Sequence, residues 1–208
     1  MRRPSGVSAI VLAAGGGSRF GGGKLLARLG GQPILEVVLD NLREAPVDEV
    51  IVVVGADAER LREVCERYGV RTVANEEWQR GQSTSVRAGL RACGGEAAVF
   101  LLGDQPFVGA DAVERLVAAF AEGANVAVAT YGGKRRNPVL FSREVWPLLE
   151  AELAGDEGAR SVLRRHPELV VDVPCEGVGD PTDVDTREDL RRLEEMRGPV
   201  GDYKMAGG

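Results

Sequence analysis

An apolar run that breaks into a glycine-rich, basic loop constrains the fold of this chain more than any other feature. Residues 10–14 read Ile-Val-Leu-Ala-Ala, the pattern of a buried parallel strand, and the next ten residues include six glycines together with Arg19 and Lys24. Glycines allow backbone N–H groups to close around a polyanion without obstruction by Cβ atoms, and the two cations neutralise it. The segment therefore predicts a phosphate site at the end of the first strand of an α/β sheet. The alternative is a flexible glycine hairpin with two solvated cations.

Two common phosphate loops do not match this segment. The P-loop pattern requires glycine where Ser18 stands and a hydroxyl residue where Leu25 follows the lysine. The dinucleotide fingerprint, counted from Gly15 and Gly17, requires a third glycine at the position of Phe20. The loop is therefore of another phosphate-binding type.

Length and composition limit the class of protein. The 208 residues fit one α/β domain, which we expect at residues 1–197, followed by a flexible C-terminal tail at residues 198–208. A formal charge of −6 without a long Lys/Arg run argues against a nucleic-acid partner. The three cysteines match no metal-ligand spacing, which favours reduced thiols in the cytoplasm. The apolar run from Val7 is too short for a signal peptide or a membrane span.

Strand-like and helix-like segments alternate along most of the chain, as in a parallel, doubly wound sheet. Apolar runs predict strands at residues 10–12, 50–54, 70–73, 99–102, 126–130, 138–141 and 169–173. Helical periodicity predicts helices near residues 34–43, 57–67, 83–90, 113–120, 143–153, 158–165 and 187–196. We therefore expect a single-domain three-layer α/β/α sandwich with a Rossmann-like, mostly parallel sheet.

Aspartates at two points in the sequence are candidate ligands for Mg²⁺, which takes one or two protein carboxylates and keeps several waters. Asp104 follows the predicted strand 99–102, at the edge where parallel strands present functional side chains. Its alternative role is to cap the next helix. Asp183 and Asp185 alternate around Val184, which would put both on one side of a strand end. We favour Asp185 as the second ligand and keep Asp183 in reserve; Asp185 or Thr186 could instead cap the last helix.

Between these aspartates, residues 75–90 combine a glycine and hydroxyl side chains near a predicted helix start. Gly81 would allow close approach of a flat base, and the hydroxyls of Ser83 and Ser85 would supply the fixed hydrogen bonds that base discrimination needs. The alternative is ordinary helix capping, with Trp78 in the core. His166, the only histidine, stands at a predicted helix end, where pairing with the helix dipole is its expected role.

Taken in order, motifs over almost the whole chain resemble those of the MobA-like NTP transferase family, most of all its molybdenum cofactor cytidylyltransferase branch. The strings are LAAG at 12–15, Arg19 with KLL at 24–26, Asn75 through Ser85-Val86, GDQP at 103–106, NPVLF at 137–141, GDEGAR at 155–160 and DVDT at 183–186. The resemblance implies the nucleotide-diphospho-sugar transferase type of fold. It also implies Mg²⁺-dependent transfer of CMP from CTP to a phosphorylated acceptor, with molybdopterin as that acceptor, release of pyrophosphate and a molybdoenzyme as a possible client.

The resemblance also implies roles for particular residues. Arg19 and Lys24 would be the catalytic cations on the β- and γ-phosphates, and Asp104 and Asp185 the metal ligands. Alanine at position 14 implies CTP rather than GTP. Nucleotide-binding roles are implied for Leu12, Ala13, Ala14, Gly15, Gly16, Gly17, Gly81, Ser85 and Asp104.

The acceptor side departs from the pattern of that branch. Its members carry Gly-His-Pro before the Val-Leu-Phe strand, whereas this chain carries Arg136-Asn137-Pro138. We expect Asn137 to contact the acceptor, and Arg160, at a predicted helix start, to face the acceptor phosphate; the alternative for Arg160 is a solvated surface side chain.

Three other functions remain open at this point. A GTP-dependent or sugar-phosphate nucleotidyltransferase would use the same fold, and so would an NAD(P)H-dependent oxidoreductase, against which the absent dinucleotide fingerprint counts. A non-catalytic nucleotide-binding partner would also match, although the presence of all four charged site residues counts against it.

Overall fold

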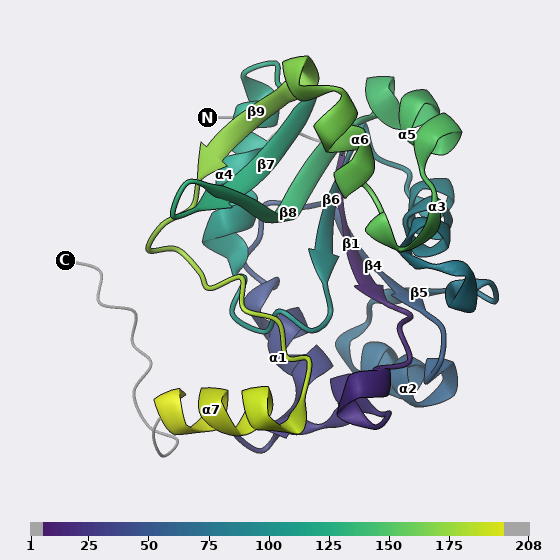
Figure 1. The fold of residues 1–208 in the computed structure, drawn as a ribbon, viewed down its shortest axis with the longest axis vertical. Coiled ribbons are helices and arrows are strands. Elements are labelled where there is room, and N and C mark those ends of the chain that lie inside the picture. Colours follow the sequence, from purple (N-terminus) through teal and green to yellow (C-terminus); the bar gives the residue numbers. More distant parts are fainter. Residues whose placement is uncertain (1–5, 198–208) are drawn as a thin grey trace.

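The computed structural model describes residues 6–197, which form one seven-stranded sheet between two layers of helices (Figure 1). The strand order is β5-β4-β1-β6-β8-β7-β9, and β8 runs antiparallel to both neighbours while every other pair is parallel. The strands are β1 (Val7–Ala13), β4 (Glu49–Val54), β5 (Arg71–Ala74), β6 (Ala97–Leu102), β7 (Val126–Tyr131), β8 (Lys134–Ser142) and β9 (Val170–Pro174). The expected three-layer, mostly parallel sandwich is therefore confirmed.

The helices divide between the two faces of the sheet. One face packs against α1 (Ile34–Asn41), α2 (Ala58–Tyr68) and α4 (Ala110–Ala121). Helix α7 (Arg187–Arg197) adds Leu193 to the same core and lies beside the short strand Arg28–Leu29. The other face packs against α3 (Gln82–Ala92), α5 (Trp146–Glu152) and α6 (Arg160–Arg165). A small hairpin, β2 (Arg28–Leu29) with β3 (Gln32–Pro33), precedes α1.

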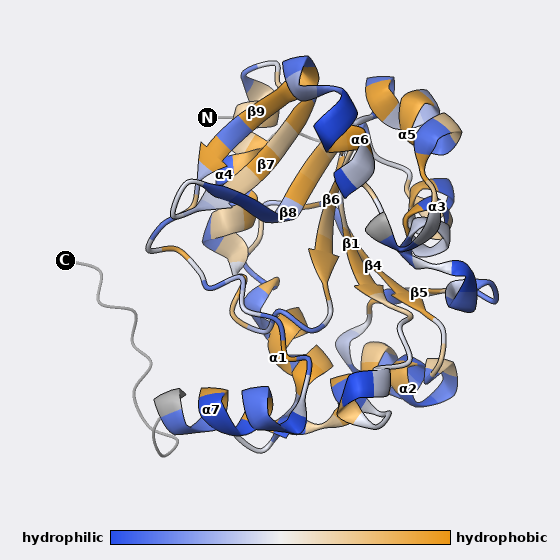
Figure 2. Ribbon diagram, viewed as in Figure 1, coloured by the Kyte–Doolittle hydropathy of each residue, from blue (hydrophilic) through white to orange (hydrophobic). Residues whose placement is uncertain are grey.

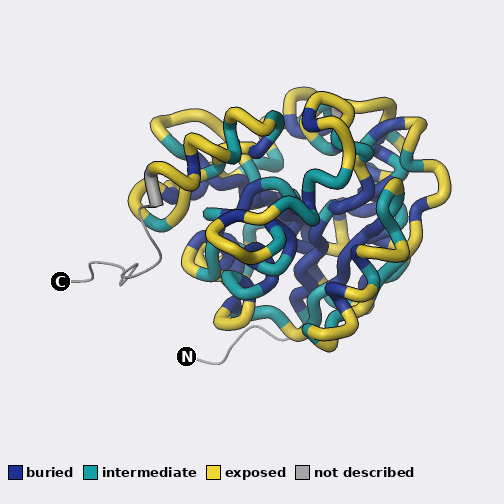
Figure 3. The backbone as a smooth tube through the Cα atoms, turned by 90° about the horizontal axis from the view of Figure 1, so that it is seen from below, coloured by how far each residue is buried: buried dark blue, intermediate teal, exposed yellow. Residues whose placement is uncertain are grey.

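The strands in the middle of the sheet, where β1 lies between β4 and β6, are largely hydrophobic (Figure 2). A strand covered by helices on both faces has no polar side, so it reads as a continuous apolar run rather than an alternating one. Residues 7–11 of β1 and 97–101 of β6 are all buried. Figure 3 shows buried residues gathered at the centre of the molecule and exposed residues at its periphery.

The sheet opens between β6 and β8 at the carboxyl end of β6. Pairing of these strands covers only Ala97–Phe100 of β6, opposite Val139–Ser142 of β8, although β6 continues to Leu102. The pairing register of β8 with β7 shifts at the same level, so that Asn137 and Pro138 fall between the paired residues Arg136 and Val139. The polar first half of β8 thus leaves the layer formed by β1 and β6.

Several predicted elements differ from the structure in extent. Strand β8 begins at Lys134, four residues before the predicted start, because its outer half is an exposed hairpin arm without apolar alternation. The helix predicted over 143–153 is a 3-10 turn, Arg143–Val145, followed by α5. Residues 183–185 form no strand, so the strand alternation expected for the two aspartates is wrong.

Other expectations concern the ends of the chain, the cysteines and membranes. The tail expected at residues 198–208 lies outside the described residues. Cys65, Cys93 and Cys175 are all buried, free thiols. Within residues 6–197, none of the helices combines the length and apolarity needed to cross a bilayer.

We predict that neighbouring glycines in the turn between α3 and β6 differ sharply in their tolerance of a side chain. A Cβ atom at Gly95 would lie 2.3 Å from the backbone oxygen of Gly6, whereas one at Gly94 would meet nothing closer than 3.9 Å. Gly95→Ala should therefore lower the free energy of unfolding by about 1–3 kcal/mol, as overpacking of backbone does. Gly94→Ala should stay within about 0.5 kcal/mol of the parent. Urea unfolding of both variants measures this, and equal values would contradict the packing described.

Candidate active site

The first glycine loop and the Asp104 turn begin side by side because β1 and β6 are parallel neighbours. Leu12 pairs with Leu102 at their carboxyl ends, and the Gly103 amide donates to the Leu12 carbonyl at 3.0 Å. In an open α/β sheet this edge is where ligands bind. The geometry brings together two motifs that lie about ninety residues apart in sequence.

The glycine loop is a structured turn rather than a flexible hairpin. Residues 18–20 and 24–26 form 3-10 turns, each preceded by a glycine in the left-handed region, Gly17 at φ 58° and Gly23 at φ 62°. The side chains of Phe20 and Leu25 are buried in the core beneath the loop. These two anchors fix the loop, and Arg19 and Lys24 stand directly beside them in sequence.

Four charged side chains from three distant segments form one cluster at this edge. The Lys24 ammonium lies 2.5 Å from Asp104 Oδ2 and 3.5 Å from Asp185 Oδ1, and the Arg19 guanidinium lies 3.0 Å from Asp185 Oδ2. Lys24 is largely buried, with 13% of its side chain exposed, whereas Arg19 is 75% exposed. The predicted catalytic cations and predicted metal ligands therefore meet, with Lys24 between the two carboxylates. We call these four residues the charge cluster.

Neither Asp104 nor Asp185 caps a helix with its side chain, whereas the alternative cap at Thr186 is confirmed. Helix α4 begins after Gly109, so Asp104 does not cap it. At the start of α7, Thr186 and Asp189 form a reciprocal cap: the Asp189 amide donates to Thr186 Oγ1 at 3.1 Å and the Thr186 amide donates to Asp189 Oδ2 at 2.8 Å. Asp185 contributes only its backbone amide to that cap, so its carboxylate faces Lys24 and Arg19.

Asp183, the reserve candidate, is held differently. Its Oδ1 accepts a hydrogen bond at 2.9 Å from the side-chain amide of Gln105, which is itself buried. Burial raises the pKa of the Asp183 carboxyl above its ordinary value, and the charge of Asp104 raises it further. Asp185, not Asp183, is the carboxylate in contact with the charge cluster's cations.

The charge cluster suits Mg²⁺ or Mn²⁺ bound together with a triphosphate. Asp104 and Asp185 both contact one cation, Lys24, so their oxygens converge on a common point. Within the described residues, no set of three or more His, Cys, Asp or Glu side chains forms a complete metal cage. Mg²⁺ is commonly held by two protein carboxylates, with water and substrate phosphates completing its shell, so the residues present fit this ion.

The expected base-binding segment lies beside the glycine loop. A Cβ atom at Gly16 would lie 3.1 Å from the Trp78 ring, so half-buried Trp78 is close to the loop backbone. The Ser85 hydroxyl is buried and accepts a hydrogen bond at 2.9 Å from the side-chain amide of Asn75. Helix α3 begins at Gln82, one residue before the predicted start at Ser83.

Gly81 has a packing reason to be glycine. Its φ is 109°, and a Cβ atom there would lie 2.6 Å from the carbonyl carbon of Gly155 and 2.7 Å from a carboxylate oxygen of Asp156. The GDEGAR segment therefore folds over the amino terminus of α3. No side chain caps that terminus.

The two predicted acceptor residues lie on either side of the open part of the sheet. Asn137 is half-buried where β8 separates from β6, and its peptide bond to Pro138 is cis. Arg160 is the exposed first residue of α6, near enough to Asp183 for its charge to oppose the rise in that carboxyl's pKa. Both thus lie toward the edge that carries the charge cluster.

Two residues of this region escaped sequence reasoning. In the sequence, Gln105 is part of the GDQP motif, but nothing there assigns it a role. Its hydrogen-bond partners, Pro181 and Asp183, are 76 and 78 residues away along the chain. Gly55 has no sequence signal at all, although a Cβ atom there would lie 2.5 Å from the Ala14 carbonyl and 2.9 Å from Trp78 Cβ.

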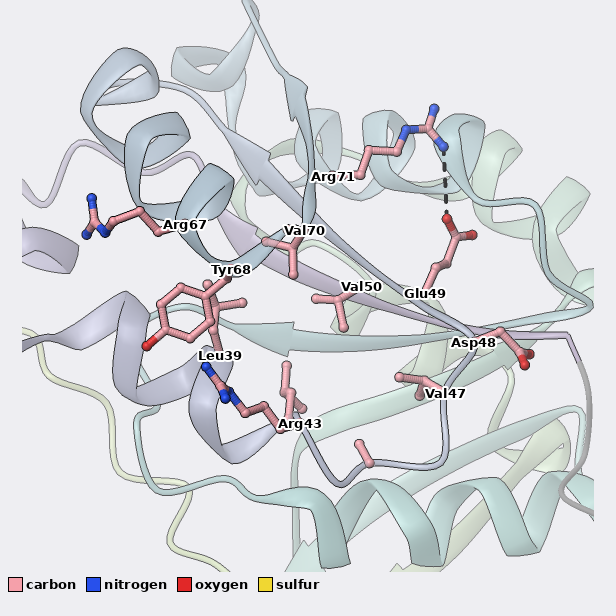
Figure 4. Close-up of a pocket in the computed structure, with 13 residues that line it drawn as sticks. Leu39, Arg43, Val47, Asp48, Glu49, Val50, Arg67, Tyr68, Val70 and Arg71 are labelled. Carbon is pink, nitrogen blue, oxygen red and sulfur yellow. Dashed lines mark ion pairs between the residues drawn. The ribbon is translucent and has the colours of Figure 1, made fainter.

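A cavity of about 600 Å³ lies at the opposite edge of the sheet (Figure 4). It is lined from the ends of α1 and α2 and the amino ends of β4 and β5, including Tyr68, Val50 and Arg71. Its cations are engaged locally: Arg43 stacks on the Tyr68 ring and pairs with Asp40, and Arg71 donates to the carbonyl of Ala92. The cavity is therefore separate from the charge cluster.

Comparison with known proteins gives the family. The MobA-like NTP transferase domain matches residues 9–170. A nicotine blue oxidoreductase from Paenarthrobacter nicotinovorans is 31% identical over 199 residues, covering 90% of this chain and 96% of the relative. A molybdenum cofactor guanylyltransferase from Vibrio atlanticus is 30% identical over 175 residues, covering 83% and 86%.

Solved structures agree with this assignment. A homologue of Mycobacterium tuberculosis Rv0371c, from Mycobacterium sp. strain JC1, superimposes with a TM-score of 0.82 at 33% identity, covering 94% of this chain and 98% of that one. Rv0371c from M. tuberculosis H37Rv, solved as a complex with manganese, gives 0.75 at 31% identity, covering 92% and 99%. The fold is that of a nucleotidyltransferase. The chain belongs to the MobA-like NTP transferase family.

His166 lies outside the candidate active site. It follows the last residue of α6, as expected, but its ring pairs with Glu152 at 3.0 Å and with Glu168 at 3.4 Å. The hydrogen bond to Glu152 raises the pKa of His166 above its ordinary value of 6.5, and the same bond lowers the pKa of Glu152 below 4.5. A side-chain pair, rather than the helix dipole alone, is therefore its role.

We predict a pH-dependent contribution of this pair to stability and none to catalysis. A raised histidine pKa stabilises the folded protein below pH 6.5, and the effect is lost as pH rises through the folded-state pKa of His166. The contribution of Glu152 is complete above pH 4.5 and is lost as pH falls through the lowered pKa of that carboxyl. His166→Gln should lower the melting temperature at pH 5.5 and leave it unchanged at pH 8.5. A difference of the same size at both pH values would contradict the ion pair, and a loss of turnover would contradict its distance from the site.

Proposed function

We propose that this protein transfers CMP from CTP to a phosphorylated acceptor, with Mg²⁺ as the metal and molybdopterin as the acceptor, and releases pyrophosphate. The observation that carries the proposal is the charge cluster, in which Lys24 and Arg19 meet Asp104 and Asp185 beside the glycine loop. Two cations and two convergent carboxylates supply what a metal triphosphate requires at one point. The GTP-dependent and sugar-phosphate enzymes of the same fold remain the alternatives for substrate.

The proposed reaction requires stabilisation of negative charge more than it requires proton transfer. An acceptor phosphate oxygen attacks the α-phosphorus of CTP, and the bond to the β-phosphate oxygen breaks. The acceptor phosphate is already largely dianionic near neutral pH, so no strong general base is needed. Arg19 and Lys24 would contact the β- and γ-phosphates and stabilise the charge that develops on pyrophosphate, together with the backbone amides of residues 15–17. Mg²⁺, when bound to Asp104 and Asp185, would add positive charge at the same point.

Alanine at position 14 supports a pyrimidine base through the family resemblance, which associates alanine there with CTP. Ala14 is 3% exposed, and its methyl group lies 2.8 Å from where a Cβ of Gly55 would be, so the space between the loop and Trp78 is already closely filled. Ala14 is therefore packed beneath the loop. Ser85, which is held by Asn75, and the backbone at Gly81 are the groups that would contact the cytosine edge.

Acceptor identity rests on the relatives and on the open part of the sheet. One relative is named a molybdenum cofactor guanylyltransferase, and we propose an acceptor of the same class for this chain. Arg160 would bind the acceptor phosphate and Asn137 a neutral polar group of the acceptor. A molybdoenzyme that receives the product is the partner that this acceptor implies.

One relative supports a second candidate function. The Paenarthrobacter protein is named an oxidoreductase, which favours reduction of a small substrate by NAD(P)H on this scaffold. The charge cluster argues for nucleotidyl transfer instead, because hydride transfer needs no pair of metal-binding carboxylates. A protein that only binds and delivers a nucleotide would also have little use for Lys24 between them.

We predict that Lys24→Ala lowers turnover by about 10²-fold or more at saturating CTP, since one preorganised charge contact to the leaving pyrophosphate is lost. Pyrophosphate release with CTP, Mg²⁺ and molybdopterin is the measurement. Lys134→Ala, which removes an exposed lysine at the start of β8, is the matched control and should retain turnover. Normal turnover by folded Lys24→Ala protein would remove Lys24 from the mechanism.

Ligand-induced stabilisation distinguishes the candidate functions. We expect CTP to raise the melting temperature by a few degrees at about a hundred times its dissociation constant, where binding adds roughly 2.7 kcal/mol. Mg²⁺ should enlarge the shift, and GTP, ATP, UTP and NADPH should give smaller ones. A larger shift with GTP would change the base assignment. A shift with NADPH alone would favour the oxidoreductase and contradict the proposal.

A further inference from the structure

The segment that delivers Asp185 runs antiparallel along the turn after β6. At one end, the Asp180 amide donates to the carbonyl of Phe107 at 3.1 Å, and Gly179 forms a β-bridge with Val108. At the other end, the Val184 amide donates to the carbonyl of Asp104 at 2.9 Å. Two backbone contacts thus bracket the run from 180 to 184.

Between these contacts, backbone pairing is interrupted by a proline. Pro181 has no N–H group, so it cannot donate a backbone hydrogen bond to the facing turn. The side chain of Gln105 takes over: its Nε2 donates to the Pro181 carbonyl and to Asp183 Oδ1, both at 2.9 Å. One amide group therefore connects the two segments where the backbone cannot.

The surroundings of the Gln105 side-chain oxygen, Oε1, indicate that the two hydrogen bonds donated by Nε2 are the reason for a glutamine at this position. Gln105 is 2% exposed, and among the described residues its Oε1 is buried without a hydrogen-bond partner. A buried acceptor without a donor is unfavourable, so an apolar side chain would pack there at lower cost. The glutamine is consistent with a requirement for its donor group.

We propose that Gln105 is a positioning residue that holds the 181–185 segment so that Asp185 stays within reach of Asp104 and Lys24. Val184 is fully buried and fixes the same segment from the core side, which leaves Asp183 on Gln105 and Asp185 on the charge cluster. The inference rests on the proposed function, because it concerns the geometry of the metal carboxylates. It assigns Asp183 to support rather than to the metal.

Mn²⁺ binding tests this role without turnover. Electron paramagnetic resonance titration of full-length protein with Mn²⁺ in the presence of CTP gives the dissociation constant, and hydrogen–deuterium exchange reports on residues 178–190. Gln105→Met, which keeps the length of the side chain and removes both donors, should weaken Mn²⁺ binding about tenfold, the equivalent of one hydrogen-bond-sized loss. It should also speed exchange in that segment. Gln32→Met, which loses one exposed bond to Asp40, is the matched control and should change neither.

A pair of variants at the partner residue keeps the test valid if Gln105→Met does not fold. Asp183→Ala removes one of the two bonds and should weaken Mn²⁺ binding severalfold, whereas Asp183→Asn keeps an acceptor for Gln105 and should restore it. Faster exchange with unchanged Mn²⁺ affinity would make Gln105 a structural residue only and overturn the proposal. Loss of Mn²⁺ binding in Asp183→Asn equal to that in Asp185→Asn would make Asp183 a ligand, with the same result. Absence of Mn²⁺ binding by the parent protein would instead contradict the proposed function itself.

Discussion

The close approach of Asp104 and Asp185 around one cation is the constraint on which the rest of the site depends. Two carboxylates repel each other unless positive charge lies between them, and here Lys24 supplies that charge at 2.5 and 3.5 Å. The three residues come from the first loop, the middle of the chain and the segment before the last helix. Holding them together therefore requires most of the fold to be in place.

The C-terminal segment completes the site from the far end of the sequence. It runs along the turn after β6 and places Asp185 in the charge cluster. It then continues into α7, which begins with the Thr186–Asp189 cap. The guanidinium of Arg187 lies 5.0 Å from the centroid of the Phe20 ring, so the first turn of α7 also contacts the glycine loop. The loop that carries Arg19 and Lys24 and the helix that follows Asp185 are thus in direct contact beside the charge cluster.

The sequence predicted the sheet and one half of the site because both follow from local pattern. A continuous apolar run followed by glycines or by Asp104 marks a parallel strand and its carboxyl end, and parallel neighbours present those ends at one edge. Asp185 was favoured on an expected strand alternation that the structure does not have, and its contact with Lys24, 161 residues away, required the structure. The role of Gln105 could not be predicted, because it depends on two acceptors from a distant segment, the carbonyl of Pro181 and the carboxylate of Asp183, lying beside its side chain. Strand β8 was underestimated because its exposed arm lacks apolar alternation, and Ser85 gave no sign that Asn75 would hold its hydroxyl.

A crystal structure of the protein with Mn²⁺ and a non-hydrolysable CTP analogue tests the central claim most directly, with anomalous scattering locating the metal. The account predicts Mn²⁺ bound to the carboxylates of Asp104 and Asp185, with Lys24 and Arg19 in contact with the triphosphate and the glycine loop around it. Metal and nucleotide bound elsewhere, or a nucleotide at this edge with both carboxylates still paired to Lys24 and no metal between them, would contradict it.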